Sequence, residues 1–294
     1  MFICYYPVWF PYRIFEEYLY LTRDYRSSHK LSYFSNAFFG LIMRCSGVDC
    51  KVKHLWYDSG MKAMILAAGF GTRLRPLTGT IPKPLIEING KPVIVHTLDA
   101  LKKAGIKDIV INLHHLGDMI RHKLGDGSQF GLSIQYSPEP EIKGTGGALL
   151  LARKFLTEPF YLINGDILFD LDLAVLPPLL KEKGADAVMV LYRANHEEAD
   201  KANVYMDRNG YVQGLFKPPP DTAPYIFTGI QFLKPDTINY IPENIHQPST
   251  TMHMYPGMLG NKRLIAGYLH NGFWIDIGNP KNLEQAKKGI VATR

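Results

Sequence analysis

Cysteine is scarce in this chain of 294 residues. The three cysteines, Cys4, Cys45 and Cys50, all lie before residue 60, so the rest of the chain can form neither a disulfide nor a thiolate metal site. This usage fits a reducing compartment, and we expect the protein in the cytoplasm. Long apolar runs are missing too: no apolar window of about 18 residues exists, which argues against a membrane span.

Dense blocks of one charge are also absent. The formal net charge is +6, and lysine and arginine are spread along the chain instead of forming a basic patch. We therefore expect no nucleic acid partner, and the charge is compatible with a small anionic substrate. No internal repeat of about 20 to 50 residues is visible, which argues against a solenoid or a β-helical tail.

Residues 1–60 differ in composition from the rest of the chain. They hold nearly half of the aromatic residues, show no sustained period of a helix or a strand, and lack the pattern of a secretory signal. We expect this leader to be poorly ordered or not part of the native protein, with the functional domain over 61–294. A short helix over 15–25 that packs on the domain is the alternative.

From residue 61 onward, apolar runs alternate with amphipathic segments, which is typical of a layered α/β domain. This order predicts a doubly wound, mostly parallel sheet whose ligand lies beyond the carboxyl ends of the strands. After residue 192 the runs become shorter, and Asn209-Gly210 predicts a hairpin in a small β-rich subregion. The predicted strands are 63–67, 109–113, 133–136, 160–163 and 187–191, and the predicted helices are 93–104, ended by Gly105, and 118–124, ended by Gly125.

A loop rich in glycine and positive charge follows the first predicted strand. Gly69 and Gly71 let backbone N–H groups approach phosphate oxygens closely. Arg73 can bind two such oxygens at once, and Lys83 adds a point charge. Two familiar phosphate loops do not fit, because a dinucleotide fingerprint needs a third glycine where Leu74 stands and a P-loop needs Gly-Lys-Ser/Thr at 71–73. The loop therefore predicts a different kind of nucleotide site.

The longer string from Gly69 to Pro84 reads G-x-G-T-R-L-x-P-L-T-x-x-x-P-K-P. It resembles the signature of the sugar-1-phosphate nucleotidylyltransferases. The resemblance extends over nearly all of 61–294 and implies a Rossmann-like nucleotidyltransferase fold, with the β-rich subregion binding the sugar. It also implies transfer of a nucleoside monophosphate from a nucleoside triphosphate to a sugar 1-phosphate, with pyrophosphate as the second product.

The resemblance implies roles for particular residues of this chain. Arg73 and Lys83 would be the catalytic residues, since nucleotidyl transfer depends on positioning and charge neutralisation. The sugar phosphate would be bound by Asn164, Lys217, Thr228 and Gly229, although Phe216 stands where relatives commonly have an acidic residue. The nucleotide would be bound by Leu66, Ala67, Ala68, Gly69, Gly71, Thr72, Arg73, Lys83 and Gly146.

Two aspartates follow apolar, strand-like runs. Asp166 comes after the run 160–165, and Asp276 lies within the segment 273–280. A lone aspartate in such a place can simply cap the next helix. The resemblance implies instead that both are ligands of Mg²⁺, which is commonly held by one or two carboxylates together with substrate phosphates.

Adjacent histidines, His114 and His115, follow the second predicted strand of the domain. They can reach a cleft. On extended backbone, neighbouring side chains point in opposite directions, so we do not expect the two histidines to form a close metal pair.

Several alternatives stay open at this point. The short mannose-1-phosphate guanylyltransferases and the N-acetylmuramate-1-phosphate or other hexose-1-phosphate uridylyltransferases are both similar, so the triphosphate is expected to be GTP or UTP. A binding or regulatory module without turnover is a second reading, and a homo-oligomer is a possible assembly. A nicotinamide-dependent oxidoreductase is disfavoured, since Leu113-His114 stands where an acidic residue would end the second strand.

Overall fold

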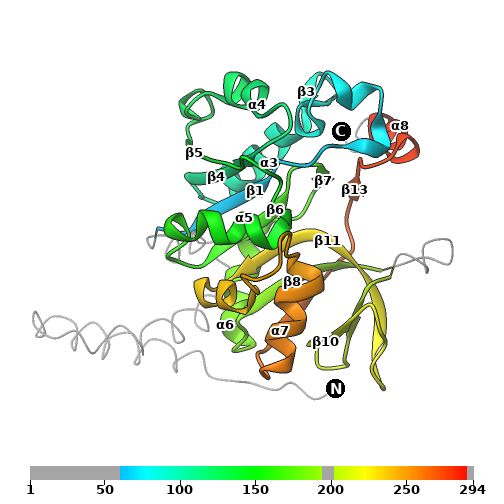
Figure 1. The fold of residues 1–294 in the computed structure, drawn as a ribbon. Helices are drawn as coiled ribbons and strands as arrows, with labels where there is room; N and C mark the ends of the chain where they lie inside the picture. The colour runs from blue at the N-terminus through cyan, green and yellow to red at the C-terminus, as the bar shows by residue number, and fades with distance from the viewer. Residues whose placement is uncertain (1–59, 194–201, 290–294) are drawn as a thin grey trace, which may run out of the picture. The chain divides into compact units, whose positions relative to one another are not determined.

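The computed structural model describes residues 60–193 and 202–289 (Figure 1). The leader predicted over 1–60 lies, apart from Gly60, outside the described residues. Among the helices of the described ranges, none has the length and apolar character that a membrane crossing requires.

The main sheet is mostly parallel, as predicted. Strands β5, β4, β1 and β6 lie side by side in parallel, and β8 pairs in parallel with β12. The long strand β11 runs antiparallel between β6 and β8 and joins the two parallel parts (Figure 1). The bounds are β1 Lys62–Leu66, β4 Asp108–Leu113, β5 Ser133–Pro138, β6 Phe160–Asn164, β8 Ala187–Tyr192, β11 Ala223–Leu233 and β12 Ile265–His270.

Helices cover both faces of this sheet, which explains why its strands read as continuous apolar runs. On one face, Ile65 of β1 packs in a cluster with Leu98 of α3 and Leu176 of α6. On the other face, Met64 belongs to a cluster with Leu149 of α5 and Met258 of α7. The helices are α3 Val93–Lys103, α4 Gly117–Leu124, α5 Gly144–Ala152, α6 Leu176–Glu182, α7 Tyr255–Gly260 and α8 Pro280–Gly289.

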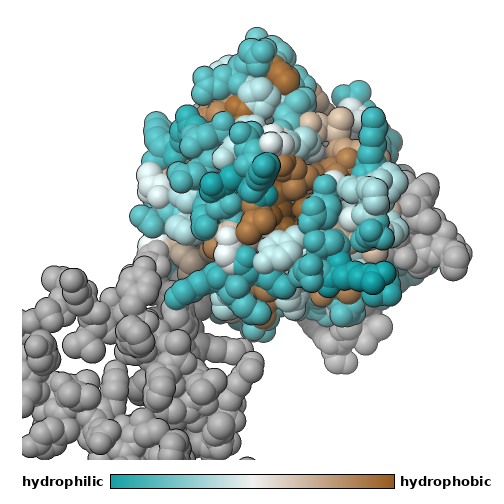
Figure 2. All heavy atoms as spheres, turned by 90° about the horizontal axis from the view of Figure 1, so that it is seen from below, coloured by the Kyte–Doolittle hydropathy of each residue, from teal (hydrophilic) through white to brown (hydrophobic). Residues whose placement is uncertain are grey.

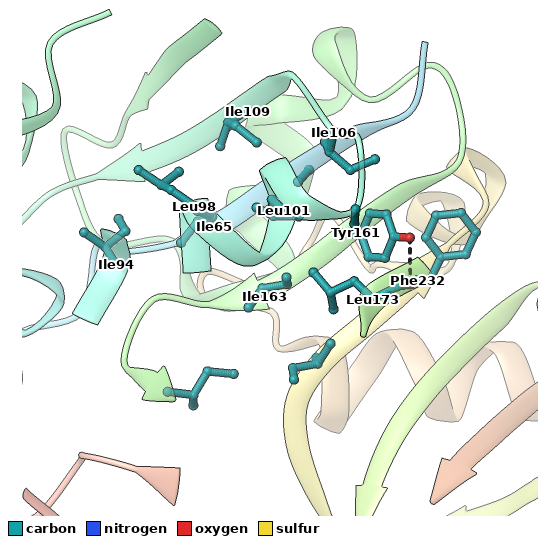
Figure 3. Packing of buried hydrophobic residues seen from close by; sticks show 14 of the residues in the cluster. Ile65, Ile94, Leu98, Leu101, Ile106, Ile109, Tyr161, Ile163, Leu173 and Phe232 are labelled. Carbon is teal, nitrogen blue, oxygen red and sulfur yellow. Dashed lines mark hydrogen bonds between the residues drawn. The ribbon is translucent and has the colours of Figure 1, made fainter. Parts of the chain in front are cut away.

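Figure 3 shows the first of these clusters. Tyr161 of β6 lies beside Phe232 of β11, with ring centroids 4.7 Å apart. The Tyr161 hydroxyl donates to the carbonyl of Leu173 at 2.9 Å, so this buried polar atom has a partner. The cluster fixes β6 against β11, and the end of β6 is where the predicted metal ligand Asp166 follows.

The predicted helix ends are confirmed. Gly105 follows α3 with φ +81°, and Ile106 donates its N–H to Leu101 at 3.0 Å, which is the Schellman arrangement. Gly125 ends α4 with φ +57°. Both glycines adopt backbone angles that other residues rarely take.

The predicted hairpin is confirmed as well. Strands β9 (Val204–Met206) and β10 (Val212–Leu215) pair antiparallel around Gly210, which has φ +83°. The Asp207 carboxylate accepts N–H groups from Asn209 and Tyr211, each at 2.9 Å, and so fixes the turn. β9 then pairs with the first residues of β11, which makes the β-rich extension of the sheet.

Two short strands, β7 (Ile167–Phe169) and β13 (Trp274–Asp276), pair antiparallel outside the main sheet, over a small cluster that includes Leu168 and Ile275. β13 lies in the strand-like run that contains Asp276, whereas β7 was not predicted. A further short pair is β2 (Glu87–Ile88) with β3 (Lys91–Pro92). The molecule seen from below has a largely hydrophilic rim around a hollowed hydrophobic area (Figure 2).

Short 3₁₀ and π-helical segments make up the remaining secondary structure of the described residues. The 3₁₀ turns are η2 Thr72–Leu74, η3 Leu77–Gly79, η4 Lys83–Leu85, η5 Ser128–Phe130, η6 Arg153–Phe155, η7 Leu173–Val175 and η9 Pro235–Tyr240. The segment η10, Thr250–Met254, is a π-helical turn that leads directly into α7.

Candidate active site

A cleft of about 230 Å³ opens at the carboxyl ends of the parallel strands. β4 lies on one side of β1 and β6 on the other, so the chain order reverses at β1, and such reversals are where open α/β sheets bind ligands. The predicted site residues that line the cleft are Leu66, Ala67, Ala68, Gly69, Gly71, Lys83, Asn164 and Asp166.

The loop after β1 is closed on itself. Gly71 has φ +63°, and its carbonyl accepts the hydroxyl of Thr78 at 2.8 Å. A Cβ at position 71 would lie 2.9 Å from Thr78 Cγ2, so there is no room for a side chain there. Thr72 and Arg73 follow in η2 and are exposed. The glycine is therefore needed both for its backbone angle and for close packing.

The β7–β13 pair brings the two predicted metal ligands together. Asp276 is in register with Ile167, and Ile277 donates its N–H to the carbonyl of Asp166 at 3.0 Å. The two carboxylates come from parts of the chain that are 110 residues apart, and a backbone ladder holds them side by side.

Lys83 lies between these carboxylates. Its ammonium group donates to Asp166 Oδ2 and lies 3.8 Å from Asp276 Oδ1, and the lysine side chain is only 11% exposed. Burial raises the pKa of Asp276, and the negative charge of Asp166 raises it further, whereas Lys83 and Arg73 lower it. The aspartates are thus close enough to repel each other, and the lysine offsets that repulsion.

Arg73 also lies close to Lys83 and Asp276, beside Gly278. A Cβ built on Gly278 would lie 2.6 Å from Arg73 Nη2, 2.7 Å from Asp276 Oδ1 and 3.0 Å from Lys83 Nζ. The absence of a side chain at Gly278 therefore lets an arginine, a lysine and an aspartate meet. The structure brings together Arg73, Lys83, Asp166 and Asp276, the four charged residues that the sequence analysis assigned to catalysis and to the metal.

A second set of hydrogen-bonded polar side chains lies on the cleft. Asn112, which interrupts the apolar run of β4, accepts the N–H of Ala67 at 2.8 Å and donates to Glu139 at 2.7 Å. The other Glu139 oxygen accepts the N–H of Lys143 at 2.8 Å. Both Asn112 and Glu139 are buried and line the cleft. A polar residue within a buried strand was the available signal for Asn112.

Gly146, a predicted nucleotide-binding position, does not line the cleft. Its N–H donates to the carbonyl of Pro248 at 2.8 Å, and a Cβ there would lie 2.8 Å from the same oxygen. Its neighbours Gly144 and Thr145 line the cleft instead. The geometry gives Gly146 a packing role at the start of α5.

The predicted sugar-phosphate residues are only partly brought together. Gly229 has φ +83° and packs on Asn164, whose Nδ2 would lie 2.5 Å from a Cβ at position 229. The hydroxyl of Thr228 is engaged inside the sheet, since it donates to Val190 at 2.8 Å. Lys217 is exposed after β10 and is not part of the cleft lining.

Across the described residues, no group of three or more His, Cys, Asp or Glu side chains is arranged to hold a metal. Asp166 and Asp276 form a set of two carboxylates. That donor set suits Mg²⁺, which keeps waters and takes its remaining ligands from substrate phosphates.

Comparisons with known proteins agree with this geometry. Residues 62–293 match the family model described as nucleotidyl transferase. The chain is 33% identical over 227 residues to the mannose-1-phosphate guanylyltransferase catalytic subunit beta of Xenopus tropicalis, and 34% identical over 230 residues to the mannose-1-phosphate guanyltransferase of Schizosaccharomyces pombe. Each alignment covers 76% of this chain and 62% of the relative, so the chain spans less than two thirds of these proteins.

A solved structure is similar over most of its length. A Bacillus anthracis protein assigned as a glucose-1-phosphate thymidylyltransferase, in complex with sucrose, superposes with a TM-score of 0.68 at 26% identity. The match covers 78% of this chain and 94% of that one. Together with the family model, which spans both the glycine loop and the two aspartates, this shows that the chain belongs to the nucleotidyl transferase family.

Proposed function

We propose that this protein transfers a guanylyl group from GTP to mannose 1-phosphate, giving a GDP-sugar and pyrophosphate. The observation that carries the proposal is the position of Lys83 between Asp166 and Asp276, with Arg73 beside them at the end of a glycine loop. The similarity to two mannose-1-phosphate guanylyltransferases supports the choice of substrates.

The reaction is an in-line displacement. An oxygen of the sugar phosphate attacks the α-phosphorus of GTP, the bond from that phosphorus to the bridging oxygen breaks, and pyrophosphate leaves with the electron pair. Lys83 and Arg73 stabilise the negative charge that shifts onto the leaving group, because Lys83 lines the cleft and Arg73 reaches the same point beside Gly278. The backbone of the glycine loop positions the phosphates without any covalent step.

The proposal includes Mg²⁺ held by Asp166 and Asp276. When bound, the ion neutralises phosphate charge and orients the phosphate oxygens. The two carboxylates carry like charges and repel each other. Both already face the ammonium group of Lys83, whose positive charge offsets that repulsion. Asp276 is further oriented by the N–H of Gly278, which donates to its Oδ1 at 2.6 Å.

The choice of guanine rests on Glu139. Each Glu139 oxygen accepts a hydrogen bond, one from Asn112 and the other from Lys143, so this side chain presents acceptor oxygens to the cleft. Guanine offers two adjacent donors, an N–H and the N2 amino group, whereas uracil offers a single N–H between two carbonyls. A buried acceptor on the cleft therefore favours guanine.

The test is a panel of nucleoside triphosphates against mannose 1-phosphate, glucose 1-phosphate and N-acetylmuramate 1-phosphate, with released pyrophosphate as the readout. We expect the highest kcat/KM with GTP and mannose 1-phosphate in the presence of Mg²⁺. A preference for UTP would move the assignment to the uridylyltransferases. Binding of GTP without any pyrophosphate release would support a regulatory module in its place.

A further inference from the structure

The adjacent histidines have contacts that the proposed chemistry does not use. His114 and His115 follow β4 directly, where the chain leaves the sheet beside the cleft. His114 Nδ1 donates to the carbonyl of Glu139 at 2.9 Å, and His115 Nε2 donates to the carbonyl of Thr78 at 3.0 Å. The pair therefore divides its hydrogen bonds between two segments, the loop that follows β1 and the segment that follows β5.

The Thr78 side of this arrangement is the end of the glycine loop. The Thr78 hydroxyl donates to the carbonyl of Gly71 at 2.8 Å, and Thr78 is buried at 1% exposure. His115 thus reaches the loop through a residue that closes it. Within residues 71–85 the regular structure consists of three short 3₁₀ turns, so contacts such as that of His115 help to fix the loop.

Phe70 connects the two histidines to the tip of the loop. Its ring centroid lies 5.4 Å from that of His114, nearly perpendicular, and 5.5 Å from that of His115. Phe70 nevertheless remains 38% exposed. The two imidazoles therefore form part of the packing that covers the buried side of this ring.

We propose that His114 and His115 are positioning residues that hold the phosphate-binding loop in register with the base-binding side of the cleft. His115 acts through Thr78 and Phe70, and His114 acts through the Glu139 backbone. The inference rests on the proposed function, because it assigns the loop to the triphosphate and Glu139 to the base. It predicts that the histidines set the affinity for the nucleotide without contacting it.

Two substitutions separate the hydrogen bond from the packing. His115→Phe keeps a ring beside Phe70 but removes the N–H that Thr78 accepts, and His115→Gln keeps an N–H donor of similar reach. The matched control is His122→Phe, which changes an exposed histidine on α4. The removed bond is worth about a factor of ten in binding.

The affinity of the purified full chain for GTP and for mannose 1-phosphate is measured by calorimetry, separately from turnover. We expect His115→Phe to weaken GTP binding about tenfold with mannose 1-phosphate binding unchanged, and His115→Gln to restore most of the loss. Equal GTP affinity in the wild type and in His115→Phe, or an equal loss for both ligands, overturns this inference alone. If the wild type binds GTP without turnover, the proposed transferase activity is overturned. The GTP affinities of the wild type and the two His115 variants still test the positioning role in that case.

Hydrogen exchange gives a readout that needs no ligand. We expect the amides of residues 69–78 to exchange faster in His115→Phe than in the wild type, with rates in the rest of the described domain unchanged. His115→Gln is expected to exchange at close to the rate of the wild type. Unchanged exchange over 69–78 in His115→Phe, or a general acceleration across the domain, overturns the positioning role.

Discussion

The backbone N–H of Ile277 donates to the carbonyl of Asp166 at 3.0 Å. This one bond continues the β7–β13 ladder past its last residue and places Asp276 beside Asp166. Side chains alone would not keep two carboxylates together, since they repel each other. The main chain fixes their separation and leaves Lys83 and any bound cation to offset the charge.

Replacing Lys83 tests the charge assignment. Lys83→Met removes the cation that both aspartates share, and we expect kcat/KM to fall about a hundredfold or more. The control is Lys91→Met, because Lys91 also pairs with an aspartate, Asp99 at 2.6 Å, but on the exposed surface where such pairs contribute little. Steady-state kinetics on both variants check the prediction, and similar activity in the two would contradict it.

The aspartates are expected to set the metal requirement. Asp166→Asn keeps the shape of the side chain and removes its charge, so we expect turnover to fall about a hundredfold and half-maximal activity to need more Mg²⁺. Asp236→Asn, at an exposed position on η9, is the control. Mg²⁺ titrations of activity check this, and a titration curve for Asp166→Asn that overlays the wild type would refute the metal assignment.

Glu139 is expected to select the base. Glu139→Gln places an amide donor where guanine also presents donors, so we expect the ratio of kcat/KM for GTP to that for UTP to fall about tenfold or more. Glu141→Gln changes a largely exposed carboxylate two residues away and is the control. Competition between the two triphosphates measures the ratio directly. An unaltered preference would show that Glu139 does not read the base.

Gly229 tests the packing behind Asn164. A Cβ at position 229 would lie 2.5 Å from Asn164 Nδ2 at a backbone angle of φ +83°. We expect Gly229→Ala to lower the free energy of unfolding by about 1 to 3 kcal/mol more than Gly184→Ala, which has φ +58° but open space around it. Urea denaturation of both variants isolates the steric contact, and equal losses would argue that Asn164 simply moves aside.

Tyr255 gives a prediction for alkaline pH. Burial raises the pKa of the Tyr255 hydroxyl well above its ordinary value of 10.0, and this hydroxyl donates to Gln231. The unfolded chain therefore loses this proton first, so the stabilising contribution is complete below pH 10 and is lost as the pH rises above it. At neutral pH we expect Tyr255→Phe to lower the free energy of unfolding by about 1 to 3 kcal/mol.

The difference between the wild type and Tyr255→Phe should then shrink above pH 10, because only the wild type carries the titrating group. Urea denaturation at several pH values between neutral and alkaline measures this difference. A gap that stays constant over the range would show that the hydroxyl ionises in the same way in the folded and unfolded chain.

The sequence predicted the parts of the fold that depend on local pattern. The strand over 63–67 and the helix end at Gly105 follow from apolar runs and from glycine at a positive φ, and both are confirmed. The glycine loop with Lys83 could be predicted as a phosphate site because its glycines and charged residues lie within one short stretch of the chain. These features need no knowledge of distant residues.

The rest depends on contacts between distant segments. β7 and β13 have three residues each, too few to show a period, so their pairing and the closeness of Asp166 to Asp276 were not predictable from pattern alone. β11 was not predicted as a strand, and nothing local in its sequence indicates that it runs antiparallel to β6 and β8. Pro248, whose carbonyl accepts the N–H of Gly146, is about 100 residues away in sequence.

That carbonyl of Pro248 has a consequence for how anions enter the cleft. It accepts N–H groups from both Gly146 and Gly147, in the first turn of α5. The positive pole of this helix is thus partly satisfied by the protein's own backbone before any ligand arrives. Under the proposed function, attraction of a polyphosphate then falls mainly to the side-chain cations Arg73 and Lys83, so the association rate should decrease steeply as ionic strength rises.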